Sequence, residues 1–422
     1  MASYLLLSSP IGGHVAPVRA VGAALVRQGH RVRMITGARF RGRIERDGIS
    51  FIPWPAAADY DDVDLNASFP ARAPLRGMKA VQFDLCNVFA EPMPHQSAAI
   101  RAALDAEPVQ AIITELSVTG LIPLLQSGRP RPPIHVLGCT PLPVSSRDTF
   151  PYGLGLAPPS SALGRVRARL MTQLARRLVL APVQRRGDAL LRGLGLPALK
   201  VFILEWFTMA ERLWQLTVPE FEYPRSEMPG NLRFAGPLLP DAGGDLPGWW
   251  GDLDGKQRVV HVTQGTLANA DLSMLLGPAL AGLAGEDLLV VATTGGRPVS
   301  AIPGALPANA RAAEMIPYPQ LLPKVDVMVT NGGYGGVQFA LTHGVPLVVA
   351  GEGEDKPEIA ARVAWSGIGR DLRTGRPTPQ AIASAVRALL RETSYREAAA
   401  KLAARSRSTD AIETITGALP LV

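Results

Sequence analysis

One pattern of residues occurs in both halves of this chain and restricts what it can fold into. An apolar run at 4–7 is followed by a loop at 8–16, a helical pattern that opens at Pro17 and stops at Gly29, and a second apolar run at 32–36. Two strands joined by a helix lie parallel, because the helix carries the chain back to the edge where it started. The first half therefore predicts a parallel sheet covered by helices.

The rest of the chain continues this pattern. The runs at 109–116 and 134–138 are apolar almost throughout, as expected of strands that are buried on both faces. A second parallel α/β sheet of similar size is predicted in the second half. There we expect strands at 258–263, 288–292, 325–330 and 346–350, a helix from the loop 264–266 to about 284, a helix from the loop 332–336 to about 343, and two helices within 379–405.

A segment dense in proline and glycine, 236–248, separates the two halves. Ligands of open parallel sheets bind at the carboxyl ends of the strands, so two such domains facing each other would form a cleft. We expect an N-terminal domain at 1–235, a linker at 236–256, a C-terminal domain at 257–405, and a tail at 406–422 that packs back on the N-terminal domain.

Composition excludes several classes of protein. Hydrophobic residues make up 47% and charged residues 19%, which suits packed cores and not a disordered chain. Two cysteines, Cys86 and Cys139, rule out a disulfide scaffold and a multi-cysteine zinc module. No apolar run reaches the ~20 residues of a membrane span and no signal peptide is evident, so we expect a soluble, cytoplasmic protein. The formal charge of +7 is too small to demand a nucleic acid partner.

Two segments depart from the α/β pattern. Residues 53–96 are irregular and rich in large apolar side chains, which either line an apolar pocket or anchor the loop on the core. Residues 163–193 are rich in arginine. Such a basic helix can lie on a membrane surface, but we expect a solvated arginine face whose apolar side docks on the domain, because the charge excess is local.

The glycine-rich loop 332–336 is the sharpest chemical signal. It leads from a strand into a helix N-terminus, where free N–H groups and the positive end of the helix dipole suit a phosphate. A plain tight turn is the alternative. The loop is not a P-loop, since no Gly-Lys-Ser/Thr follows, and the Gly12-Gly13 loop of the N-terminal unit lacks the acid of a nicotinamide fingerprint.

His14 follows the first strand, at the edge of the sheet where ligands bind. It could accept a proton, since the ordinary pKa of histidine is ~6.5. Glu115 ends a later strand at the same edge, and a carboxylate on one ring nitrogen would orient the imidazole. A purely structural histidine is the alternative. The acidic run 61–64 could hold a divalent metal, but such loops are usually solvated, so we assign no metal.

Together these residues resemble the family 1 glycosyltransferases of GT-B fold, the bacterial relatives of UDP-glycosyltransferases that decorate macrolides and phenolic natural products. The segment 13–17 is similar to the family's Gly-His-x-x-Pro, whose histidine is the catalytic base, and Glu115 stands where the family has a supporting aspartate. The resemblance covers nearly the whole chain. It implies two Rossmann-like α/β domains facing a cleft, with His14 as the base.

Motifs of the second half extend the resemblance. The segments 263–266 and 332–336 are similar to those that contact the donor diphosphate, 315–318 to the one that holds the nucleotide base, and 354–356 to the one that grips sugar hydroxyls. We place the apolar acceptor against Phe83, Phe89 and Phe150. The implied donor contacts are Gly13, Gln264, Gly265, Thr266, Met315, Ile316, Pro317, Asn331, Gly332, Gly333, Gly335, Gly336, Val337, Glu354, Asp355 and Lys356.

Three positions depart from the family pattern: Asn331 replaces a histidine, Phe339 a glutamate and Lys356 a glutamine. The resemblance implies inverting, metal-independent transfer from a UDP- or TDP-linked sugar to a hydroxyl or phenol of an apolar acceptor, with no cofactor. The departures keep open a nucleotide-sugar-binding protein without transferase activity, or a nucleotide-sugar epimerase. A homodimer is allowed but not specified by the sequence.

Overall fold

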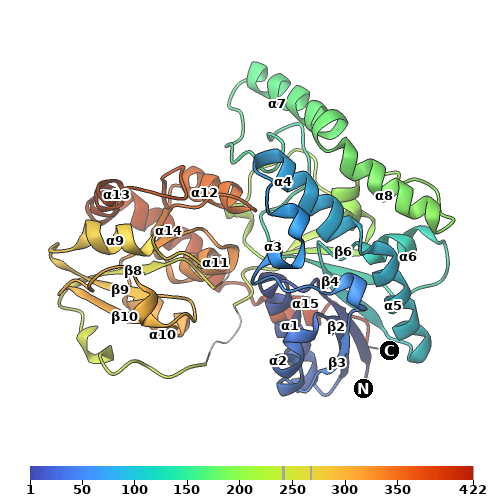
Figure 1. Ribbon diagram of the computed structural model, residues 1–422, viewed down its shortest axis with the longest axis horizontal. Helices are drawn as coiled ribbons and strands as arrows, with labels where there is room; N and C mark the ends of the chain where they lie inside the picture. Colours follow the sequence, from blue (N-terminus) through green and yellow to red (C-terminus); the bar gives the residue numbers. More distant parts are fainter. Residues whose placement is uncertain (240–242, 267–268, 422) are drawn as a thin grey trace.

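Two parallel sheets with helices packed on them make up the molecule (Figure 1). The computed structural model describes residues 1–239, 243–266 and 269–421. The first sheet has the strand order β3-β2-β1-β4-β5-β6-β7 and the second β10-β9-β8-β11-β12-β13. All strand pairs among these residues are parallel, which confirms the predicted α/β class.

The first sheet draws all its strands from the first 234 residues. They are β1 (Ser3–Leu7), β2 (Arg31–Thr36), β3 (Ser50–Pro53), β4 (Ala111–Glu115), β5 (Ile134–Gly138), β6 (Arg212–Gln215) and β7 (Leu232–Phe234). Its helices are α1 (Gly12–Arg27), α2 (Arg41–Arg46), α3 (Leu65–Ser68), α4 (Gly77–Phe83), α5 (Met93–Ala106), α6 (Ile122–Gln126), α7 (Ala162–Leu174) and α8 (Ala181–Gly193). Every residue of the central strand β4 is buried, as its apolar sequence predicts.

The second sheet begins after the linker, of which residues 240–242 lie outside the described residues. Its strands are β8 (Arg258–Thr263), β9 (Leu288–Thr293), β10 (Ala310–Ala313), β11 (Val327–Thr330), β12 (Leu347–Val349) and β13 (Gly369–Asp371). Its helices are α9 (Leu276–Leu283), α10 (Tyr318–Leu321), α11 (Tyr334–His343), α12 (Lys356–Trp365), α13 (Pro379–Arg391) and α14 (Thr393–Arg407).

Two predicted helix starts are wrong. Helix α1 begins at Gly12 and not at Pro17, because the carboxylate of Asp62 accepts a hydrogen bond from the Gly12 N–H at 2.7 Å and satisfies a donor of the first turn. Helix α9 begins ten residues after the β8 loop residue Thr266. There Gln264 Oε1 accepts hydrogen bonds from two backbone N–H groups near the helix start, those of Leu275 and Leu276, both at 3.1 Å.

The last helix, α15 (Ala411–Thr416), returns to the first domain. It lies against α1, and Ile415 shares a hydrophobic cluster with residues of β1 and α1 (Figure 1). The hydroxyl of Tyr4 donates a hydrogen bond to the carbonyl of Pro420 at 2.9 Å. The two domains also meet directly, where Gln215 Nε2 donates to the hydroxyl of Tyr334 at 3.0 Å.

Candidate active site

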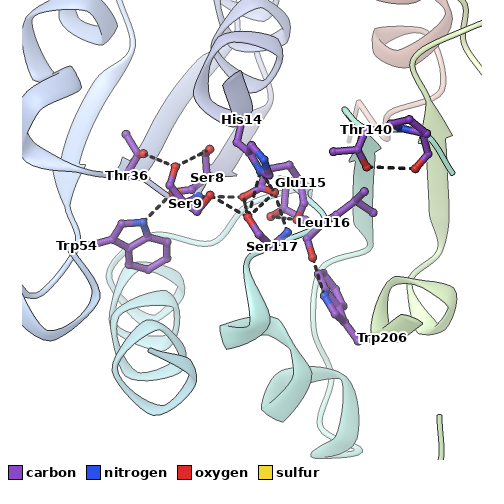
Figure 2. Close-up of polar contacts among 12 residues, drawn as sticks. Ser8, Ser9, His14, Thr36, Trp54, Glu115, Leu116, Ser117, Thr140 and Trp206 are labelled. Atoms are coloured by element: carbon purple, nitrogen blue, oxygen red, sulfur yellow. Dashed lines mark hydrogen bonds and ion pairs between the residues drawn. The ribbon is translucent and has the colours of Figure 1, made fainter. Parts of the chain in front are cut away.

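The centre of the first sheet brings His14 and Glu115 together. Strands β1 and β4 are hydrogen-bonded neighbours, so the loop after β1 and the last residue of β4 meet at one edge. His14 lies in the first turn of α1, and its Nδ1 is 2.7 Å from Oε2 of Glu115 (Figure 2). The pair that the sequence suggested is therefore present as a contact.

Glu115 is fully buried and held from several sides. Its Oε1 accepts a hydrogen bond from the Ser9 N–H at 2.9 Å and its Oε2 one from the Ser117 N–H at 2.7 Å, while the Ser117 hydroxyl donates to the same carboxylate at 2.7 Å (Figure 2). Burial raises the pKa of Glu115, but His14 and these hydrogen bonds outweigh it and lower the pKa to about 2. Glu115 therefore remains a carboxylate and accepts a hydrogen bond from the protonated Nδ1 of His14. In the neutral ring of His14, Nε2 then carries the lone pair.

Cys139 is the third member of this cluster. It directly follows β5, and one potential metal-ligand atom each of His14, Glu115 and Cys139 lie within 4.8 Å of one another. Burial lowers the pKa of His14, but the sulfur of Cys139 and the carboxylate of Glu115 raise it, and the net pKa lies well above the ordinary value. Sequence reasoning missed Cys139 and Ser117, although both follow strands that pair side by side and so had to lie at this edge.

The acidic run near α1 is used within the protein. Asp62 forms an ion pair with Arg39 besides its bond to Gly12, and Asp61 lies 3.2 Å from the same guanidinium. Asp64 caps α3 by accepting two hydrogen bonds from backbone N–H groups at 3.0 Å. Of these carboxylates, Asp62 therefore fixes the first turn of α1, which carries His14.

Three aromatic rings of the segment 53–96, which the sequence predicted to be irregular but which forms the helices α3 and α4, pack against one another. The rings of Tyr60 and Phe69 pack edge to face at 5.4 Å between centroids, and those of Phe69 and Phe83 at 6.5 Å. Burial and the charges of Glu115 and nearby aspartates raise the pKa of Tyr60 well above its usual value. All three rings are half-buried, as are Phe89 and Phe150, which form no part of this group.

The glycine-containing loops that follow β8 and β11 lie at one edge of the second sheet, as the segments after β1 and β4 do in the first sheet. Strands β8 and β11 are neighbours, and the side-chain amide of Asn331 donates a hydrogen bond to the carbonyl of Gln264, tying one loop to the other. Gly265 and Gly332 have φ angles of 70° and 85°, in the region that favours glycine. Helix α11 starts after Gly333, which has no side chain to cap it, so its first-turn N–H groups suit an anion.

The expected donor residues differ in how far their side chains are exposed at these loops. The side chain of Gln264 is buried in contact with the start of α9, and that of Val337 is buried in the core, so a donor contact at either position would come from the backbone, and both remain predictions. Ile316 and Pro317 are buried, whereas Met315 is 53% exposed. Thr266 is exposed beside Gly265, Gly335 and Gly336 form the first turn of α11, and Gly13 lies in the first turn of α1.

The segment 354–356 approaches the same loop. The buried Lys356 forms an ion pair with Glu354, whose φ is 52°. Burial raises the pKa of Asp355 to about 6, while the charges of Lys356 and of His14 from the other domain act to lower it. Asp355 and His14 are therefore within electrostatic reach of each other. Phe339, where the family has a glutamate, packs edge to face on Tyr318 at 5.4 Å and is a packing residue.

Two known protein families match parts of the chain. The "Erythromycin biosynthesis protein CIII-like, C-terminal domain" family matches residues 279–419, and the "Glycosyltransferase family 28 N-terminal domain" family matches residues 11–83. Among the described residues, no helix is both long and apolar enough to cross a membrane.

Curated relatives match over nearly the whole length. The 4'-demethylrebeccamycin synthase of Lentzea aerocolonigenes is 43% identical over 99% of both chains. The UDP-glycosyltransferase 2 of Phaeomoniella chlamydospora is 34% identical over 97% of this chain and 93% of its own. The solved spinosyn rhamnosyltransferase SpnG with thymidine diphosphate is 16% identical and superposes with a TM-score of 0.69 over 98% and 99% of the two chains. This chain thus belongs to the GT-B glycosyltransferases of natural-product biosynthesis.

Proposed function

We propose that this glycosyltransferase moves a sugar from a UDP- or TDP-linked donor to a hydroxyl or phenol of an apolar acceptor, with inversion at the anomeric carbon and without a metal ion. The 2.7 Å contact between His14 Nδ1 and the buried Glu115 carboxylate carries the proposal. An oriented imidazole suits a base that takes a proton from a hydroxyl or phenol.

The chemistry follows from that orientation. His14 Nε2 removes the proton of the acceptor hydroxyl as its oxygen attacks the anomeric carbon from the face opposite the diphosphate. The new carbon–oxygen bond forms while the bond to the diphosphate breaks, and the proton stays on the imidazole, where Glu115 stabilises the positive charge. Such proton transfer contributes roughly 10²–10⁴-fold to the rate.

The second domain supports the leaving group in this proposal. The first-turn N–H groups of α11 and the exposed loop at 265–266 would bind the diphosphate, where fixed dipoles stabilise the growing negative charge. Lys356 could exchange its Glu354 partner for a phosphate oxygen, and Asp355 could accept hydrogen bonds from sugar hydroxyls. A cationic side chain and a helix dipole can stabilise this charge without a bound metal.

A donor panel tests this function. The purified chain with UDP- and TDP-sugars and apolar phenols should release nucleoside diphosphate, and the product should have the inverted anomeric configuration by NMR. The correct nucleoside diphosphate at 100 times its Kd should stabilise the fold by about 2.7 kcal/mol. EDTA should leave the rate unchanged. Loss of activity in EDTA with recovery in Mg²⁺ would refute the metal-free reaction, and conversion of the donor alone would indicate an epimerase.

The raised pKa of His14 predicts the pH dependence. Only the neutral imidazole accepts a proton, so kcat/KM should keep rising with pH above 6.5, the ordinary histidine pKa, and level off only past the raised pKa. Replacing Cys139 with Ala removes one of the groups that raise this pKa and should move the rise to lower pH. An aliphatic alcohol acceptor, which does not titrate in this range, isolates the effect of His14. Identical profiles for the two proteins would show that the Cys139 sulfur does not raise the pKa of His14, and a rate already level at pH 6.5 would contradict the raised pKa itself.

A further inference from the structure

Helix α7 presents its apolar residues to solvent. Ala168 and Thr172 are buried against the domain, and the opposite side of the helix is apolar. The expectation that the apolar side docks on the domain is therefore wrong for α7, whereas it is confirmed for α8, whose Val183 and Leu191 belong to the core. We call the exposed large apolar residues of this helix α7 and the turn after it the apolar stripe: Leu163, Val166, Leu170, Leu174 and Leu178, with exposed fractions of 79%, 50%, 66%, 55% and 66%. Its spacing of three and four residues keeps these side chains in one row along the helix and the turn after it.

Arginines surround the apolar stripe without acidic partners. No Asp or Glu occurs from 161 to 187. In the described part of the chain no ion pair forms at Arg165, Arg167, Arg169 or Arg177, all of which are exposed. The remaining arginine of the segment 162–179, Arg176, pairs with Glu205 and lies over the ring of Phe202. These four arginines therefore supply a local positive charge, of which Arg165 also acts on the Asp148 carboxylate and helps to lower its pKa.

We propose that the segment 162–179 binds an anionic lipid surface, with the apolar stripe in the interface and the arginines on lipid phosphates. Arginine side chains can extend from an embedded apolar row to the headgroups. The stripe spans about 22 Å of helix axis. The helix α7 lies at the outer edge of the molecule (Figure 1), so a flat bilayer can reach the apolar stripe.

Charge favours this occupant over a second copy of the chain. A symmetric pair of α7 helices would bring the same unpaired arginines against one another, with no acid on either helix to compensate. A convex row of side chains also offers no groove for a protein segment. An anionic headgroup layer complements both the charge and the shape, and each arginine near it contributes attraction. This binding does not depend on the transfer reaction proposed above.

Vesicle co-sedimentation of the full chain tests the proposal. The protein should bind vesicles of phosphatidylglycerol mixed with phosphatidylcholine, bind pure phosphatidylcholine much more weakly, and dissociate at high salt. The double variant Leu170→Glu/Leu174→Glu should abolish binding. The triple variant Arg165→Ser/Arg167→Ser/Arg169→Ser should weaken it on the order of a hundredfold. Leu306→Glu, at an exposed site in the other domain, serves as the matched control and should bind normally.

Glycosyl transfer to a soluble acceptor and the thermal melting curve should be unchanged in these variants, which shows that they fold. Equal binding of both lipid mixtures, no binding at all, or normal binding by the Leu170→Glu/Leu174→Glu variant would overturn the proposal. So would a dimer in sedimentation velocity that this variant dissociates, since the stripe would then be an interface between two copies.

Discussion

His14→Ala should lower the rate of acceptor glycosylation by roughly 10²–10⁴-fold while leaving nucleoside diphosphate binding unchanged. The ring lies at the edge of the first sheet, whereas the glycine loops expected to hold the diphosphate belong to the second, so only the proton transfer is removed. Single-turnover rates and calorimetric binding measure the two separately. His95→Ala, at an exposed position on α5, is the matched control and should retain full activity. A full rate in His14→Ala would show that another group is the base.

Glu115→Gln separates orientation from charge at the same site. The amide keeps the shape of the carboxylate but cannot stabilise the imidazolium, so the rate should fall and the rise of kcat/KM with pH should move to lower pH, because Glu115 raises the pKa of His14. The double variant with His14→Ala should be no slower than His14→Ala alone, since Glu115 acts through the ring. Additive losses would contradict this coupling.

Local patterns predicted the strands that are buried at the centre of each sheet. Strands β1, β4 and β8 are predominantly apolar and almost entirely buried, because helices cover both faces of the sheets. Strand β6, Arg212–Gln215, escaped prediction because its four residues mix charged, apolar and amide side chains. Strands β7 and β13 have three residues each, too few to show a period. Each is an edge strand that pairs with the preceding strand of the chain, β6 or β12.

The meeting of His14 and Glu115 was predictable because both residues lie at the carboxyl edge of one parallel sheet. His14 and Glu115 follow adjacent parallel strands, and this topology brings them together whatever the details of the loops. The directions of individual side chains were not predictable, because they depend on loop geometry. Gln264 points to the start of α9 and Val337 into the core for that reason. The outward apolar stripe likewise depends on which face of α7 meets the domain.

Arg362→Met should lower the free energy of unfolding by about 3–5 kcal/mol, because it removes from two buried carboxylates the arginine that lies 2.9 Å from each, and Glu222 keeps only the more distant Arg225 at 3.7 Å. Arg362 lies on α12 with a side chain that is 1% exposed, and it contacts Glu222 and Glu358, both at 2.9 Å. Glu358 in turn accepts hydrogen bonds from the N–H groups of Gly153 and Gly155 at 2.8 and 2.9 Å. This network joins the helix that follows Asp355 to segments of the first half of the chain.

Urea unfolding measures this loss, and Arg391→Met, with a side chain that is 79% exposed, should show no measurable change. Glu222→Gln/Arg362→Met should be more stable than the sum of the two single losses predicts, because it removes both members of one buried pair. Strictly additive losses would show that the pair is not coupled.

Because the same network holds α12 next to the first domain, Arg362→Met should also let Asp355, which directly precedes α12, move away from His14. Its transfer rate should therefore fall even at temperatures where the variant remains folded.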